Sequence, residues 1–204
     1  MVTIVTLMFT SCKQCSTKSK PLFGSSGKLV VEQTISTDRQ AMFLKTNKDN
    51  ENYRWYETNV KLKNFLDEEN DGEIDMIVNI FQAIEEISET CFDTYVVKFQ
   101  HFSNGDTETE DIHAFWVEDY PLNNESIKVT FERAYEKVMS VNLPKPHSRY
   151  VVLRKQVGAV DANPQWIFGN LNSQIYVDAI TGEVSNDNPA FRNMGFKMPL
   201  GEWP

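Results

Sequence analysis

Ile127-Lys-Val-Thr-Phe-Glu-Arg-Ala-Tyr-Glu-Lys-Val-Met139 opens the part of the chain that decides the fold, which runs from Ile127 to Val184. Apolar side chains recur in it at intervals of three and four residues, so they form one stripe along an amphipathic helix. Thr130 precedes the stripe, where its hydroxyl can accept a hydrogen bond from a free N–H of the first turn. Pro144 and Pro146 prevent the helix from continuing. The pattern therefore predicts a capped helix that ends before Pro144.

Three short segments after this helix are rich in β-branched and aromatic residues, which favour strands. Gly, Asn and Pro residues separate them, as is typical of turns between antiparallel strands. The order of elements is thus predicted to be one helix followed by three strands, at 149–154, 164–168 and 174–184.

The last of these segments contains Val177-Asp-Ala-Ile-Thr-Gly-Glu-Val184. With the helix and strands before it, the stretch resembles a PepSY domain, whose hallmark is a final strand that reads roughly V-D-A-x-T-G-E-V. The resemblance covers residues 127–184 and implies a fold more directly than an activity. It assigns a structural motif to Val177, Asp178, Ala179, Thr181 and Gly182.

Asp178 within this motif is a carboxylate that could on paper serve catalysis. The residues after it favour a structural role, because an Asp side chain accepts hydrogen bonds from backbone N–H groups of a turn that follows it. We therefore expect Asp178 to bind the turn at Thr181-Gly182, with Gly182 at positive φ.

An earlier stretch looks like a first copy of the same unit. Ile74 to Ile87 carries apolar residues at helical spacing, and Phe81-Gln-Ala-Ile-Glu-Glu-Ile within it resembles the segment that begins at Phe131. Tyr95-Val-Val likewise recurs as Tyr150-Val-Val. These matches predict two helix-strand-strand units in tandem.

The remaining strands complete the predicted organisation. A hairpin is expected around Asn104-Gly105, a dipeptide that favours tight turns. We predict an α+β protein with two tandem PepSY-like units behind a β-rich N-terminal segment. The units span 29–122 and 123–204, the second ending in an aromatic strap after Val184. The predicted strands before the second unit are 29–35, 41–44, 53–62, 94–102 and 112–117.

The N-terminus resembles the end of a bacterial lipoprotein signal peptide. Residues 1–11 carry no charge, and Phe9-Thr-Ser-Cys12 is similar to the loose lipobox of Bacteroidetes-type lipoproteins. A polar stretch, 13–28, then has the composition of a flexible tether. No positive charge precedes Val2, which departs from the signal-peptide pattern, and a buried N-terminal strand is the alternative. We expect a lipid on Cys12 and a periplasmic or cell-surface protein anchored to an envelope membrane.

Charge and cysteine content narrow the classes of function. The chain has 29 acidic and 20 basic side chains, a net charge of −9, and no basic patch, which argues against a nucleic-acid partner. Cys12, Cys15 and Cys91 are too few for a disulfide framework. Cys12-Lys-Gln-Cys15 also fits a redox pair, but no strand or helix flanks it, so the lipobox is preferred. Whether Cys15 and Cys91 pair is left open.

Two metal sites can be considered and neither is favoured. Asp67 to Asp75 matches the register of a calcium loop, but position 12 is Val78 where a bidentate carboxylate belongs, so an acidic turn before a helix is expected instead. His101 and His113 could face each other across a hairpin, yet no third ligand is predictable. We expect no metal and no cofactor.

The functional expectation is binding without catalysis. No nucleophile, phosphate-loop or dinucleotide motif is present, and His101, His113 and His147 have no evident carboxylate partner in the sequence. The PepSY resemblance implies a binding or inhibitory module for a peptide or protein, with a peptidase as one such partner. The alternatives are an immunity-type lipoprotein that neutralises a toxin and a secreted enzyme. The aromatic residues that could line a binding face, or simply fill the core, are Trp116, Trp166, Phe168 and Tyr176.

Overall fold

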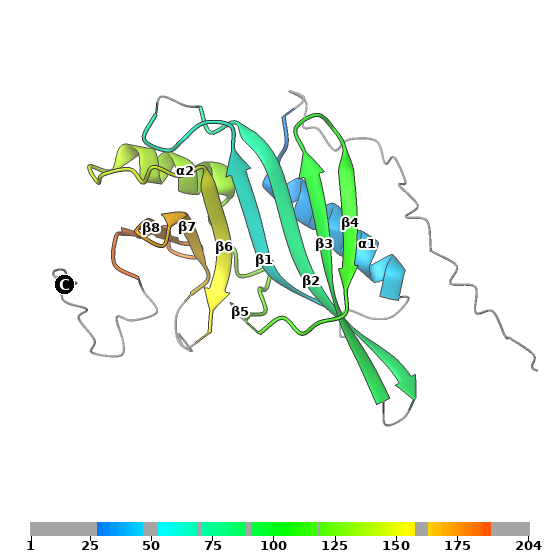
Figure 1. Cartoon of the computed structure of the whole chain (residues 1–204). Helices are drawn as coiled ribbons and strands as arrows, with labels where there is room; N and C mark the ends of the chain where they lie inside the picture. Colours follow the sequence, from blue (N-terminus) through cyan, green and yellow to red (C-terminus); the bar gives the residue numbers. More distant parts are fainter. Residues whose placement is uncertain are drawn as a thin grey trace, which may run out of the picture.

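A computed structural model describes two helices and nine strands (Figure 1). The described residues are 28–46, 53–68, 71–88, 91–117, 119–157 and 163–188, without the side chains of 85–88 and 91–92. The helices are α1 (Val31–Thr46) and α2 (Phe131–Ser140). The strands are β1 (Tyr53–Leu62), β2 (Ile74–Ser88), β3 (Cys91–Phe102), β4 (Thr107–Ile112), β5 (Asp119–Tyr120), β6 (Tyr150–Gln156), β7 (Gln165–Asn170), β8 (Ser173–Asp178) and β9 (Val184–Ser185).

The strands form one antiparallel sheet in the order β4-β3-β2-β1-β6-β7-β8-β9, with β5 paired to β6. In each half, a helix is followed by a run of strands that pair with their neighbours in sequence, first α1 with β1 to β4 and then α2 with β6 to β9. The halves meet where β1 pairs with β6, from Glu57 opposite Arg154 to Lys61 opposite Tyr150. The predicted mixed α+β class is confirmed.

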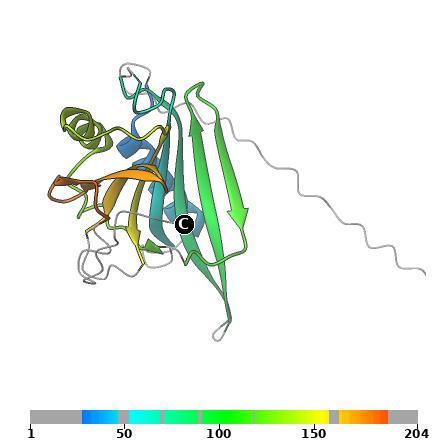
Figure 2. The ribbon, with the colours of Figure 1, turned by 60° about the vertical axis from the view of Figure 1, so that its left-hand side comes forward.

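Both helices pack on the same face of the sheet (Figure 2). Phe81 of β2 and Trp166 of β7 belong to one continuous core, which also holds residues of both helices. The register between β1 and β6 places Thr58 opposite Leu153, so the core crosses the junction without interruption. We call the other side of the sheet the open face, because among the described residues no helix lies on it.

The helix predicted from Phe131 is confirmed, and its cap is the expected one. The hydroxyl of Thr130 accepts a hydrogen bond from the N–H of Arg133 at 3.3 Å. Phe131, Ala134, Tyr135 and Val138 are buried. The three strands expected after this helix are present as β6, β7 and the pair β8 and β9, which a turn separates.

The helix predicted at Ile74 to Ile87 is wrong, because this segment is the central strand β2. Apolar residues lie on both of its faces, with Phe81 in the core and Ile80 buried on the open face. A continuous apolar run fits a strand enclosed on both sides as well as it fits a buried helix. The internal match between Phe81 and Phe131 is therefore also wrong, since one lies in a strand and the other in a helix.

The strands predicted at 29–35 and 41–44 are wrong as well, because α1 occupies this region. The residues that α1 buries have helical spacing, but two of them, Thr34 and Asp38, are polar. Hydrophobic periodicity alone therefore does not reveal this helix.

The hairpin at Asn104-Gly105 is present, with Gly105 at φ 92° between β3 and β4. Its second strand was expected at 112–117 but is the acidic segment Thr107–Ile112. An edge strand exposes most of its side chains, so charged residues are compatible with it.

Cys12, the signal remnant 1–12, residues 13–27 of the tether and the strap after Asn188 lie outside the described residues. So do Cys15 and the side chain of Cys91.

Candidate functional site at the seam of the sheet

The two halves of the sheet separate at one end of their junction. A bulge between Trp55 and Glu57 turns the start of β1 away from β6, and β5 pairs with the end of β6 in its place. Leu122, just after β5, bridges back to β1 by donating its N–H to the carbonyl of Trp55 at 2.7 Å. We call this region, formed by β1, β5, β6 and the segment 121–123, the seam.

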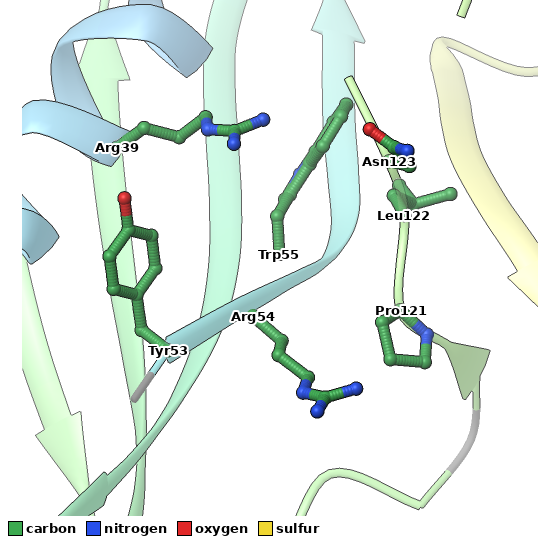
Figure 3. A pocket seen from close by; sticks show the side chains of 7 residues that line it. All are labelled: Arg39, Tyr53, Arg54, Trp55, Pro121, Leu122 and Asn123. Atoms are coloured by element: carbon green, nitrogen blue, oxygen red, sulfur yellow. The ribbon is translucent and has the colours of Figure 1, made fainter. Parts of the chain in front are cut away.

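A pocket of about 300 Å³ opens at the seam (Figure 3). Arg39 reaches it from α1, and the other lining residues come from β1 and the segment after β5. The indole of Trp55 is held in place, because its N–H lies 3.1 Å from both the carbonyl of Glu57 and the hydroxyl of Thr58. The remaining walls are formed by Tyr53, Arg54, Pro121, Leu122 and Asn123.

A pair of buried carboxyl groups, Glu57 and Asp119, joins the strands of the seam. Asp119 accepts hydrogen bonds from Nε of Arg154 at 2.6 Å and from the indole N–H of Trp116 at 3.2 Å. Burial, together with the hydrogen bond to Asp119, raises the pKa of Glu57 to about 7. Near neutral pH, Glu57 can thus carry the proton that lets two acidic groups bond to each other.

A polar network beneath α1 links the helix to the pocket. Asp38 lies 2.9 Å from Nε2 of His101, and both side chains are buried. Asn79 donates hydrogen bonds to Asp38 at 2.7 Å and to Thr34 at 3.1 Å. Thr58, which also contacts the pocket tryptophan, donates to Asn79 at 2.6 Å. Burial raises the pKa of Asp38, although its bonds to His101 and Asn79 oppose the shift.

This network has a structural role. Among the described residues, no buried side-chain N or O atom lacks a hydrogen-bond partner. A fully satisfied network fixes the position of a helix on a sheet and leaves no polar atom for a ligand.

The PepSY-like motif lies away from the seam, in the turn between β8 and β9. Oδ1 of Asp178 accepts hydrogen bonds from the N–H groups of Ile180 and Thr181, both at 2.8 Å. Gly182 has φ 75°, and its N–H donates to the carbonyl of Asp178. Burial opposes the ionisation of Asp178, but the turn N–H groups and Asn163 hold its pKa below the usual value. The carboxylate thus has the structural role expected of it, and the core holds Val177 and Ala179.

The four aromatic residues proposed as a binding face do not share one surface. Trp166 and Phe168 lie in the core under α2, where the indole of Trp166 donates to the carbonyl of Val129 at 2.8 Å. Tyr176 follows the alternation of β8 onto the opposite side and is buried there. Only Trp116 reaches the seam, through Asp119. The expectation is corrected because alternate residues of one strand point to opposite faces.

His101 and His113 do not face each other across the hairpin. His101 pairs with Thr107 across the hairpin, not with His113, so the shared metal site considered for them is ruled out. Each histidine nevertheless has a carboxylate partner, which corrects the expectation that none would. His113 lies 3.3 Å from Asp93, and His147 lies 3.0 Å from Asp67. These partners were missed because they are distant in the sequence.

Within the described ranges, no group of three or more His, Cys, Asp or Glu side chains is placed to hold a metal ion. In the acidic loop, Asp71 lies 3.3 Å from the ammonium of Lys28 and Asp75 lies 2.8 Å from that of Lys61. These carboxylates face lysines and not one another. The element that follows the loop is a strand, not the expected helix.

The residues of the seam carry no sequence motif, and the predictions missed them. One signal can be recognised once the strands are known. Glu57 and Arg154 are charged residues inside segments whose other residues favour strands. Charged residues on interior strands are seldom buried without a partner. Such a pair is therefore a reason to look for a contact between two strands.

Comparison with known proteins gives no match, whether to a family model, to a curated protein or to a solved structure. None of the helices within the described residues is long and apolar enough to cross a membrane. The function is therefore inferred from the sheet and the seam.

Proposed function

We propose that this protein is a non-catalytic binding or inhibitory module of the bacterial cell envelope, built from two tandem PepSY-like units and anchored through a lipid on Cys12. Its partner is a peptide or a protein, and it uses no cofactor. The observation that carries the proposal is the open face, which no helix covers among the described residues. Ile80 and Tyr176 are buried on it, but Tyr150 at its centre is 52% exposed.

The chemistry of the open face suits a protein partner. Tyr150 of β6 is 52% exposed in the middle of the sheet, and Arg54 is exposed near the pocket. Half-buried apolar residues such as Val152 and Phe102 lie among polar neighbours. Protein interfaces combine apolar contacts with a polar rim in this way, and tyrosine and arginine are enriched in them. A peptidase is the partner class that the PepSY resemblance implies.

The acidic edge of the sheet supports a second candidate, an immunity-type lipoprotein that neutralises a basic toxin. Glu108, Glu110 and Asp111 of β4 are all exposed, with Lys98 3.7 Å from Glu110 and Lys45 bonded to Asp111. With the net charge of −9, they favour approach of a positively charged partner.

The proposal is tested by capture of the partner with two matched variants. Tyr150→Asp places a charge on the open face, whereas Leu171→Asp places one at the turn between β7 and β8, where Leu171 is 97% exposed. We expect Tyr150→Asp to reduce the captured partner at least tenfold, because loss of a central interface tyrosine typically costs about 2 kcal/mol or more. Leu171→Asp should capture as the wild type does. The measurement is quantitative mass spectrometry of proteins bound from the native envelope fraction.

Equal capture by both variants would contradict binding through the open face. Loss of a peptidase from the Tyr150→Asp sample would favour the inhibitory module, and loss of a basic secreted protein would favour the immunity protein. Retained folding of both variants is checked by circular dichroism.

A further inference from the structure

We propose that the seam pocket binds an acidic peptide segment of the partner, with Arg39 and Arg54 holding carboxylate groups at two separate points. This inference rests on the proposed function, because it names the chemistry of the segment that the protein recognises. The evidence for it is the pair of arginines at the pocket, their positions relative to each other, and the apolar residues that line the pocket.

The two arginines are available for an external anion. Neither guanidinium forms an ion pair with any residue that the structure describes. Elsewhere in the described chain, lysines face carboxylates: Lys45 bonds to Asp111, and Lys63 lies 2.7 Å from Glu73. Two unpaired arginines around one cavity stand out in a chain with nine more acidic than basic side chains.

The arrangement of these arginines favours an extended ligand. In Figure 3, Arg39 projects from α1 toward the indole of Trp55, whereas Arg54 extends on the other side of β1, toward Pro121. The two guanidinium groups do not converge, so one compact anion would contact one of them and leave the other in water. Arg54 pairs with Gln82 and so lies on the open face, whereas Arg39 comes from the helix side. A peptide segment that passes the edge of β1 at the seam can place one carboxylate on each. Arginine suits this role because its planar fork of N–H donors matches the two oxygens of a carboxylate.

The walls of the pocket suit the apolar part of a peptide. Tyr53, Trp55 and Leu122 are largely buried and line it, and Pro121 adds a rigid apolar ring. Asn123 contributes an amide that can bind a backbone group. A volume of about 300 Å³ is at the small end of ligand pockets. It accommodates one or two side chains of a segment, not a folded element.

The direct test uses a defined probe instead of the unidentified partner. The probe is N-acetyl-Phe-Gly-Glu with a free terminal carboxylate, and its neutral analogue is N-acetyl-Phe-Gly-Gln amide. We expect the acidic probe to bind with a Kd on the order of 1 mM, as is reasonable for a short flexible peptide. It should shift the indole N–H signal of Trp55 in a ¹H–¹⁵N NMR titration.

Variants of the protein then test whether binding of the acidic probe depends on an arginine inside the pocket and not on an arginine elsewhere. Arg39→Gln is expected to weaken binding of the acidic probe about tenfold, since hydrogen bonds between charged partners are the strong ones. Arg133→Gln, on the exposed surface of α2 and outside the pocket, is the matched control and should bind as the wild type does. Arg54→Gln, at an exposed position, provides the same test if Arg39→Gln does not fold.

Binding of the neutral analogue as tightly as the acidic probe would overturn the inference, and so would equal binding by Arg39→Gln and Arg133→Gln. Failure of the inference is distinguishable from failure of the proposed function. Partner capture that depends on Tyr150 but not on Arg39 would refute the pocket alone. Charge-dependent probe binding, with capture unaffected by Tyr150→Asp, would refute the open face alone.

Discussion

Replacement of Glu57 by glutamine is expected to stabilise the protein above pH 7 and to remove much of the pH dependence of its stability between pH 4.5 and 7. Glu57 is buried beside Asp119, and its pKa in the folded state is raised from 4.5 to about 7. The folded state therefore holds a proton that the unfolded state releases, so stability contributed by this group is fully present below pH 4.5. It is lost as the pH rises through about 7.

The size of this effect follows from the shift. Each unit of pKa corresponds to 1.36 kcal/mol, so ionisation of Glu57 costs up to about 3 kcal/mol above pH 7. A glutamine side chain can donate to Asp119 and accept from Asn59 without ionising. The measurement is denaturant unfolding of both proteins at pH 5 and pH 8, with Glu108→Gln at an exposed position as the control. If Glu57→Gln and the wild type lose stability in parallel between these values, Glu57 does not hold the shared proton.

The second large effect is expected at His101. Its ring bonds to Asp38 inside the network under α1, so His101→Ala would leave a buried carboxylate without its main partner. Removing one partner of a buried hydrogen bond typically costs about 1–3 kcal/mol, and more when the group left behind is charged. His113→Ala removes a histidine that also faces a carboxylate but is 80% exposed, and a surface change of this kind stays within about 0.5 kcal/mol.

The measurement is the free energy of unfolding of His101→Ala and His113→Ala at neutral pH, which shows whether the buried network stabilises the fold. A cost at His101 no larger than that at His113 would show that the network does not stabilise the fold.

The sequence predicts elements whose signals are local. The helix that begins at Phe131 has its cap, its stripe and its stop within fifteen residues of chain. The turn after Asp178 is equally local, because the side chain binds N–H groups two and three residues ahead. Such features depend on neighbours in the chain and can be recognised from one sequence.

The predictions fail where a residue's partners lie far along the chain. Asp38 is buried in α1 because Asn79 and His101 come to it from β2 and β3, and this polar burial conceals the helix. Glu57 faces Arg154 only because β1 and β6 pair at the middle of the sheet. The seam and its pocket depend on this pairing, and no periodicity within a single segment encodes it.

The central claim, that a partner binds the open face across the seam, is tested most directly by hydroxyl-radical footprinting of the protein alone and in complex with the captured partner. The proposed function predicts that Tyr150, on the open face, becomes several-fold less reactive in the complex, while the exposed Leu171 is unchanged. Protection of Phe43 and Leu44 on α1, with Tyr150 as reactive as in the free protein, would contradict it.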